Sequence, residues 1–132
     1  MKFMVCYEAS YQAREALKVA QKHAEVWGAK IEVIQTVTRE LPLKHSQVKE
    51  MEDKLEAEVK KEFEGISIEY NAQLLVTSLE AGEQLVKFAE EEKIDQIFLG
   101  IQKTSKVGKL LFGSTAQYVI LQSPCPVITV KK

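Results

Sequence analysis

The chain alternates between two kinds of apolar pattern. Short continuous apolar runs are typical of strands buried on both faces, and apolar positions that recur every three or four residues are typical of one helix face. The runs, with one alternating stretch, predict strands at 3–7, 31–37, 66–74, 96–99 and 127–130. The repeats predict helices between residues 10 and 28, across 48–63, around 85–89 and across 113–121.

Both ends of the first predicted helix carry recognisable signals. The Ser10 hydroxyl is suited to accept a hydrogen bond from a free backbone N–H at the helix start. Gly28 is suited to the left-handed conformation in which many helices end. The apolar positions expected to be buried between them are Ala13, Ala16, Leu17, Ala20, Ala24 and Trp27.

The third predicted strand differs from the first. Between residues 66 and 74 every second residue is apolar, which indicates a strand with one solvated face, at or near the edge of a sheet. The strict alternation of strands and helices predicts an α/β fold, with a parallel sheet, helices on both faces and right-handed crossovers. We expect residues 1–132 to form a single domain.

Composition fits this interpretation. The chain has 132 residues, of which 45% are hydrophobic and 28% charged, as in an ordinary globular protein. Cys6 and Cys125 both lie in apolar stretches, so we expect two small buried core residues; a redox pair is the alternative. No CxxC pair or cluster of cysteine and histidine predicts a zinc site.

Charge bears on the choice of partner. Eighteen Lys and Arg against 19 Asp and Glu give a formal net charge of −1, which does not favour binding to DNA, RNA or a membrane surface. The apolar start, 1–7, is too short for a signal peptide, and no apolar run is long enough to span a membrane. We therefore expect a cytoplasmic protein.

Candidate chemistry lies where the first and fourth strands end, because ligands of open parallel sheets bind beyond the carboxyl ends of the strands. The stretch after the fourth strand begins at Gly100 and ends at Gly113-Ser114-Thr115, where a helix opens. Free N–H groups at a helix start, two hydroxyls and the intervening Lys103, Lys106 and Lys109 would suit a phosphate. A glycine turn with a serine cap is the structural alternative.

Motifs of conventional enzymes are missing from the sequence. There is no Walker A sequence, no GxGxxG after the first strand and no GxSxG. No residue stands out as a base that activates water, and no set of residues predicts a metal site. We therefore expect no enzymatic activity beyond, at most, slow ATP hydrolysis.

Three segments resemble the universal stress protein family: KFMVCYEASYQA at 2–13, the stretch 89–100, and GSTAQYVILQSPCPVITV at 113–130. The resemblance extends over essentially the whole chain. It implies a Rossmann-like sheet of the adenine nucleotide alpha hydrolase type, with five strands in the order 3-2-1-4-5. It also implies a homodimer paired through the fifth strand and, in one group of members, bound ATP or AMP, with Mg²⁺ accompanying the nucleotide.

Members that bind ATP carry the motif Gly-x2-Gly-x9-Gly-Ser/Thr after the fourth strand. This chain keeps the spacing from Gly100 to Gly113-Ser114 but has Lys103 in place of the second glycine, where the side chain would either obstruct the nucleotide or meet its phosphates. By resemblance, Glu8 and Thr36 would flank the adenine and ribose. Leu99 would pack on the base, Gly100 would allow close approach, and the phosphates would be held by Gly113, Ser114 and Thr115.

Three functions compete. The first is an adenine-nucleotide-binding regulator of the stress response. The second is a dimeric interaction module that binds no nucleotide, and the third is a slow ATPase. Nucleotide carried by the purified protein would separate the first from the second.

Overall fold

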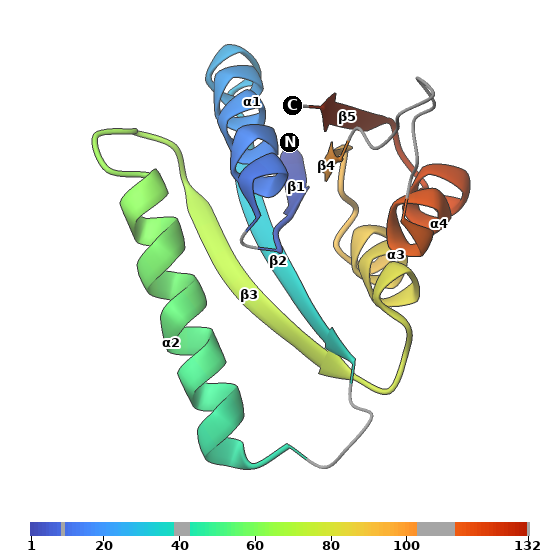
Figure 1. Cartoon of the computed structure of the whole chain (residues 1–132). Helices are drawn as coiled ribbons and strands as arrows, with labels where there is room; N and C mark the ends of the chain where they lie inside the picture. The colour runs from blue at the N-terminus through green and yellow to red at the C-terminus, as the bar shows by residue number, and fades with distance from the viewer. Residues whose placement is uncertain (9, 39–42, 103–112, 132) are drawn as a thin grey trace.

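Five parallel strands form one sheet, and helices cover both of its faces (Figure 1). The computed structural model describes residues 1–8, 10–38, 43–102 and 113–131. Along the chain the elements are β1 (Lys2–Cys6), α1 (Tyr11–Trp27), β2 (Lys30–Thr38), α2 (His45–Glu62), β3 (Tyr70–Thr77), α3 (Ala81–Glu91), β4 (Gln96–Ile101), α4 (Ser114–Gln122) and β5 (Val127–Lys131). The strand order is β3-β2-β1-β4-β5, which confirms the expected order and the edge position of the third strand.

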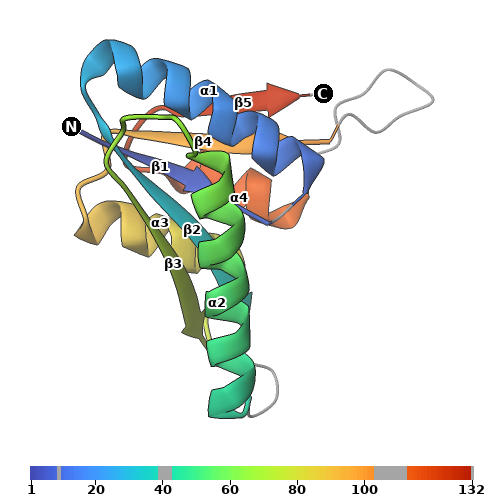
Figure 2. The ribbon, with the colours of Figure 1, turned by 90° about the vertical axis from the view of Figure 1, so that its left-hand side faces the viewer.

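Each face of the sheet has its own core. Because side chains alternate along a strand, Val5 points to the face covered by α1 and α2, whereas Cys6 points to the face covered by α3 and α4. In Figures 1 and 2 these helix pairs lie on opposite sides of the sheet. The central strand β1 is buried on both faces, as its continuous apolar run predicts.

The first helix begins and ends as predicted, but its last apolar position is not buried. The Ser10 Oγ accepts a hydrogen bond from the Ala13 N–H at 3.1 Å, and Gly28 has a left-handed φ of 65°. The expectation that Trp27 is buried is wrong, since its side chain is 64% exposed. Ala24 is the last buried position of the stripe, and the chain leaves the helix one residue after Trp27.

The third strand runs from Tyr70 to Thr77, not from 66 to 74. Its pairing with β2 starts where β2 starts, with the Ile31 N–H bonded to the Glu69 carbonyl at 3.0 Å and Tyr70 opposite Ile31. Residues 66–68 precede the start of β2, so they have no partner strand there. At the other end β2 continues to Thr38, and β3 pairs with it as far as Thr77.

The cysteines are only partly as expected. Cys6 is buried, but Cys125 is half-buried, and both are free thiols. Cys6 lies opposite Leu99 on β4, whereas Cys125 precedes Val127, which lies opposite Ile97. They are therefore two strand spacings apart, about 10 Å, and further separated along the strands, beyond the roughly 7 Å that a disulfide spans between Cα atoms. In the structure the two thiols form no disulfide with each other.

Candidate functional site

The sheet opens at the carboxyl end of β1. Among the described residues, the last backbone bond between β1 and β2 runs from the Tyr7 N–H to the Ile34 carbonyl at 2.8 Å, while β2 continues to Thr38 alongside β3. Alternate residues of a strand in a parallel sheet direct both backbone groups to the same neighbour. Ile34 faces β1, so Thr36 directs its N–H and C=O into the gap that β1 leaves.

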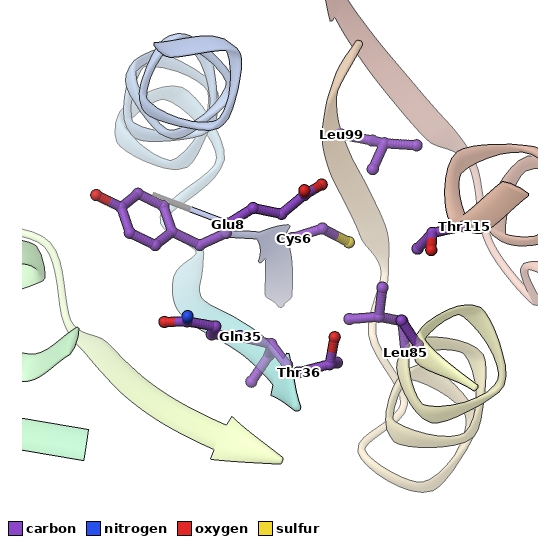
Figure 3. A pocket seen from close by; sticks show the side chains of 10 residues that line it. Cys6, Glu8, Gln35, Thr36, Leu85, Leu99 and Thr115 are labelled. Atoms are coloured by element: carbon purple, nitrogen blue, oxygen red, sulfur yellow. The ribbon is translucent and has the colours of Figure 1, made fainter. Parts of the chain in front are cut away.

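This gap forms a cavity of about 200 Å³, here called the inner cavity. Figure 3 shows Cys6 and Thr36 at the strand ends, with Leu85, Leu99 and Thr115 approaching from α3, β4 and α4. The walls combine buried apolar side chains with a few polar groups, as in sites for small planar ligands. The residues that line it are Cys6, Tyr7, Glu8, Ile34, Gln35, Thr36, Ala81, Leu85, Leu99 and Thr115.

A second hollow of about 510 Å³, the outer cavity, adjoins the first. Glu8 and Thr115 line both, so the two cavities adjoin; together, as the cleft, they lie between the ends of β1 and β4 and the start of α4. Among the described residues that line the outer cavity, Glu8 carries the only charge. Its lining residues are Glu8, Ser10, Gln12, Gly100, Ile101, Gln102, Gly113, Ser114, Thr115 and Ala116.

The amino terminus of α4 faces the outer cavity without a side-chain cap. Gly113 is the N-cap residue, and the first backbone bond of the helix runs from the Gln117 N–H to the Gly113 carbonyl at 3.0 Å. Ser114 is the first helical residue rather than the cap. The N–H groups of the first helical turn have no partner within the helix and carry the positive end of its dipole.

The two motif glycines occupy positions that differ in whether they require a glycine. A Cβ at Gly100 would overlap the backbone carbonyl of Gln12 and lie 2.9 Å from the Ala13 N, so glycine there lets α1 pack against β4. Gly113 has φ −64° and ψ 163°, which any residue adopts, and a Cβ there would meet no described atom within 4 Å. Neither its conformation nor the described packing requires glycine at position 113.

All of the described candidate residues line this cleft. Glu8, Thr36, Leu99 and Thr115 line the inner cavity, and the outer cavity adds Gly100, Gly113 and Ser114. Lys103 lies outside the described residues, as do Lys106 and Lys109.

The sequence reasoning missed the contribution of α3, whose Ala81 and Leu85 form one wall. The sequence did contain a signal for this contribution. The right-handed connection from β3, at one edge of the sheet, to β4, on the far side of β1, places α3 on the sheet face that bears the inner cavity.

The Cys6 thiol, which lines the inner cavity, is a poor nucleophile. Burial, reinforced by the Glu8 carboxylate and by Cys125, raises the pKa of Cys6 to about 12. The thiol is therefore protonated at neutral pH, and thiols react as nucleophiles through the thiolate. Cys6 thus acts as an apolar wall.

Comparison with known proteins identifies the chain's relatives. The model of the universal stress protein family matches residues 1–131. The chain belongs to the universal stress protein family. A curated universal stress protein of Methanocaldococcus jannaschii is 28% identical over 121 residues, which are 92% of this chain and 47% of that protein. The chain thus spans about half the length of that relative.

Two solved structures from Archaeoglobus fulgidus are similar over nearly the whole chain. A universal stress protein has a TM-score of 0.84 and 31% identity, covering 99% of this chain and 98% of the other. A second, solved in complex with dAMP, has a TM-score of 0.78 and 25% identity over the same shares of both chains. These likenesses establish the family's Rossmann-like fold for this universal stress protein.

Proposed function

We propose that this universal stress protein binds an adenine nucleotide in the cleft, with the base in the inner cavity and the phosphates at the start of α4. It would act as a regulator of the stress response whose nucleotide is a signal rather than a substrate. The observation that carries the proposal is the junction of the two cavities at Glu8 and Thr115. A single ligand with a planar end and an anionic end fits that arrangement.

The inner cavity offers what an adenine ring needs. Thr36 presents a backbone donor and acceptor side by side, and the edge of adenine offers an acceptor nitrogen beside an amino donor. Leu85 and Leu99 are buried apolar side chains that would pack on the faces of the ring. Burying apolar surface contributes about 25 cal/mol for each Å² removed from water.

The outer cavity offers what phosphates need. The uncapped N–H groups of α4 and the hydroxyls of Ser114 and Thr115 are donors at the positive end of a helix dipole. Glycine at 113, which the described packing does not require, leaves room for an anion to approach the backbone. The complex of the Archaeoglobus fulgidus relative with dAMP supports binding of an adenine nucleotide by this chain.

Two further groups bear on which nucleotide binds. The residues present fit Mg²⁺ in one respect: Glu8 is the one carboxylate lining the outer cavity among the described residues, and Mg²⁺ is commonly held by a carboxylate together with phosphates. Lys103, outside the described residues, would either meet the phosphates or obstruct them. Lys103→Gly would weaken binding and its salt dependence in the first case and tighten binding in the second.

The direct test begins with the purified protein, heated to release any bound nucleotide, which chromatography then identifies. Calorimetric titration of ATP, ADP and AMP follows on the emptied protein. We expect binding of at least one of them. Absence of heat for all three at millimolar concentration would refute nucleotide binding and leave the interaction module, the second candidate function.

We also propose a homodimer paired through β5. This strand lies at the sheet edge, with Ile128 and Val130 half-buried, and α4 beside it exposes Leu121. Apolar strand edges in stable proteins tend to be paired or covered. Sedimentation should show a dimer at micromolar concentration, and Ile128→Lys should give a folded monomer; a monomeric wild type would refute the proposal.

A further inference from the structure

A polar network joins the ends of β2 and β3 to the first turn of α3. The Gln84 side chain, 3% exposed, donates its Nε2–H groups to the carbonyls of Leu79 at 2.9 Å and Val37 at 3.5 Å. The Thr38 Oγ1 also donates to the Leu79 carbonyl, at 3.4 Å. The Leu79 N–H in turn donates to the Thr77 Oγ1 at 3.0 Å. The Gln84 amide thus links the end of β2 to the loop before α3, and the Leu79–Thr77 bond ties that loop to the end of β3.

This network stands directly behind the inner cavity. Ala81, one turn before Gln84, and Leu85, the residue after it, form the α3 wall of that cavity. On the other side, Val37 follows Thr36, whose backbone faces the gap. The Gln84 amide therefore connects the two walls between which the base would lie.

The described residues satisfy the Gln84 amide only on its donor side. The Gln84 Oε1 is buried and has no hydrogen-bond partner among the described residues. An unpaired buried acceptor is unfavourable, and the Leu79 carbonyl would keep a donor, Thr38, if the amide were absent. What the amide does make is a link between the two walls of the inner cavity.

We propose that Gln84 is a positioning residue for base recognition: it fixes the separation between the Thr36 backbone edge and the α3 wall. The inference rests on the proposed function. Hydrogen bonds to the base edge depend on that separation, whereas the phosphate contacts at α4 do not. Loss of the link should therefore reduce discrimination among bases and leave the preference among phosphate-chain lengths unchanged.

The test variant is Gln84→Met, which keeps the length and removes the donors. The matched control is Gln21→Met, because the Gln21 side chain is 8% exposed and its Nε2 donates to the Glu62 carbonyl at 3.0 Å, joining α1 to α2 away from both cavities. Each variant is titrated with AMP, inosine monophosphate and ATP. Its unfolding is measured in parallel.

We expect Gln84→Met to bind AMP about tenfold more weakly than the wild type does, the scale of one lost hydrogen bond. The ratio of its affinity for AMP to its affinity for inosine monophosphate should fall by a similar factor. The ratio of ATP to AMP affinity should stay at the wild-type value. Gln21→Met should lose comparable stability and keep both ratios. An unchanged AMP-to-inosine-monophosphate ratio in Gln84→Met would overturn the inference.

Two further outcomes of these experiments would also decide between the proposals. If Gln84→Met does not fold, Gln84→Leu takes its place, because it also removes both donors to the Val37 and Leu79 carbonyls. Base discrimination should then narrow by a similar factor, and a wild-type ratio would overturn the inference. A wild type that binds no nucleotide at all refutes the proposed function itself, which separates that failure from failure of the Gln84 link.

Discussion

The inner and outer cavities are built in different ways. The inner cavity is lined by residues that also belong to the core, such as Cys6, Leu85 and Leu99, each less than a twentieth exposed. The outer cavity is lined at one end by the exposed residues Gly113 and Ser114. Changes in the inner cavity should therefore affect folding and binding together. Changes at the start of α4 should affect binding far more than folding.

Gly113→Val should separate the two cavities most sharply. A Cβ there meets no described atom within 4 Å, and the branches of a valine would fill the space in which a phosphate would lie. We expect no detectable nucleotide binding at about 1 mM, a loss to weaker than about −4 kcal/mol. The free energy of unfolding should fall by no more than about 1 kcal/mol, the cost of a poorer N-cap. A variant that binds like the wild type would show that the phosphates lie elsewhere.

Gly100→Ala should have the opposite profile. The added Cβ collides with the backbone of Gln12 at the start of α1, and backbone cannot yield as a flexible side chain can. We expect the free energy of unfolding to fall by about 3 kcal/mol, as in overpacked cores. Denaturant unfolding measures it, with Gly113→Ala as the matched glycine control. Equal stability of the two variants would contradict the close packing of α1 on β4.

Ser114→Ala should produce a smaller and purely local change. If its hydroxyl donates to a phosphate, its removal should weaken binding by about 1.5 kcal/mol, the scale of a hydrogen bond to a charged group. The thermal midpoint should not move, because Gly113 rather than Ser114 caps the helix. Calorimetry on the variant and on Gln122→Ala, at the far end of α4, gives the comparison.

The cysteines provide the mildest probe. Burial raises the pKa of both thiols, that of Cys6 to about 12, and Cys125 is the more exposed. At pH 8 a thiol reagent should label Cys125 first, and bound nucleotide should slow labelling of Cys6 alone. Unfolded Cys6 ionises near its usual 9.0 while native Cys6 stays protonated, so the free energy of unfolding should fall as pH rises from 9.0 toward 12. Faster labelling of Cys6 than of Cys125 would contradict its burial.

Prediction from sequence succeeded where one segment decides the outcome. The start of α4 is set by the local residues Gly113 and Ser114, and the solvated face of β3 is visible in its alternation. Prediction from sequence failed where the outcome depends on contacts between distant segments. The start of β3 depends on where β2 begins, so the pattern from Ile66 predicted a strand that has no partner until Tyr70.

The inner cavity shows the same limit. Leu85 was predicted as part of a buried helical stripe, and it is buried, but it also forms a wall of the cavity. An apolar residue on one face of a helix looks the same in the sequence whether its side chain packs against other residues or lines a ligand site. Gln84, next to it, carries no motif, and its role depends on carbonyls that only the fold brings near.

The exposed position of Trp27 has a practical consequence. It is the single tryptophan of the chain, on the last turn of α1, and it lies beside Met1 and Asp95 at the amino edge of the sheet. Seventeen helical residues separate the two ends of α1, so the indole is about 25 Å from the cleft. Because the side chain is 64% exposed, we expect its fluorescence emission in the native state to resemble that of a solvated indole. It will register little of ligand occupancy and only weakly of unfolding, so an optical assay of this protein needs a reporter placed elsewhere.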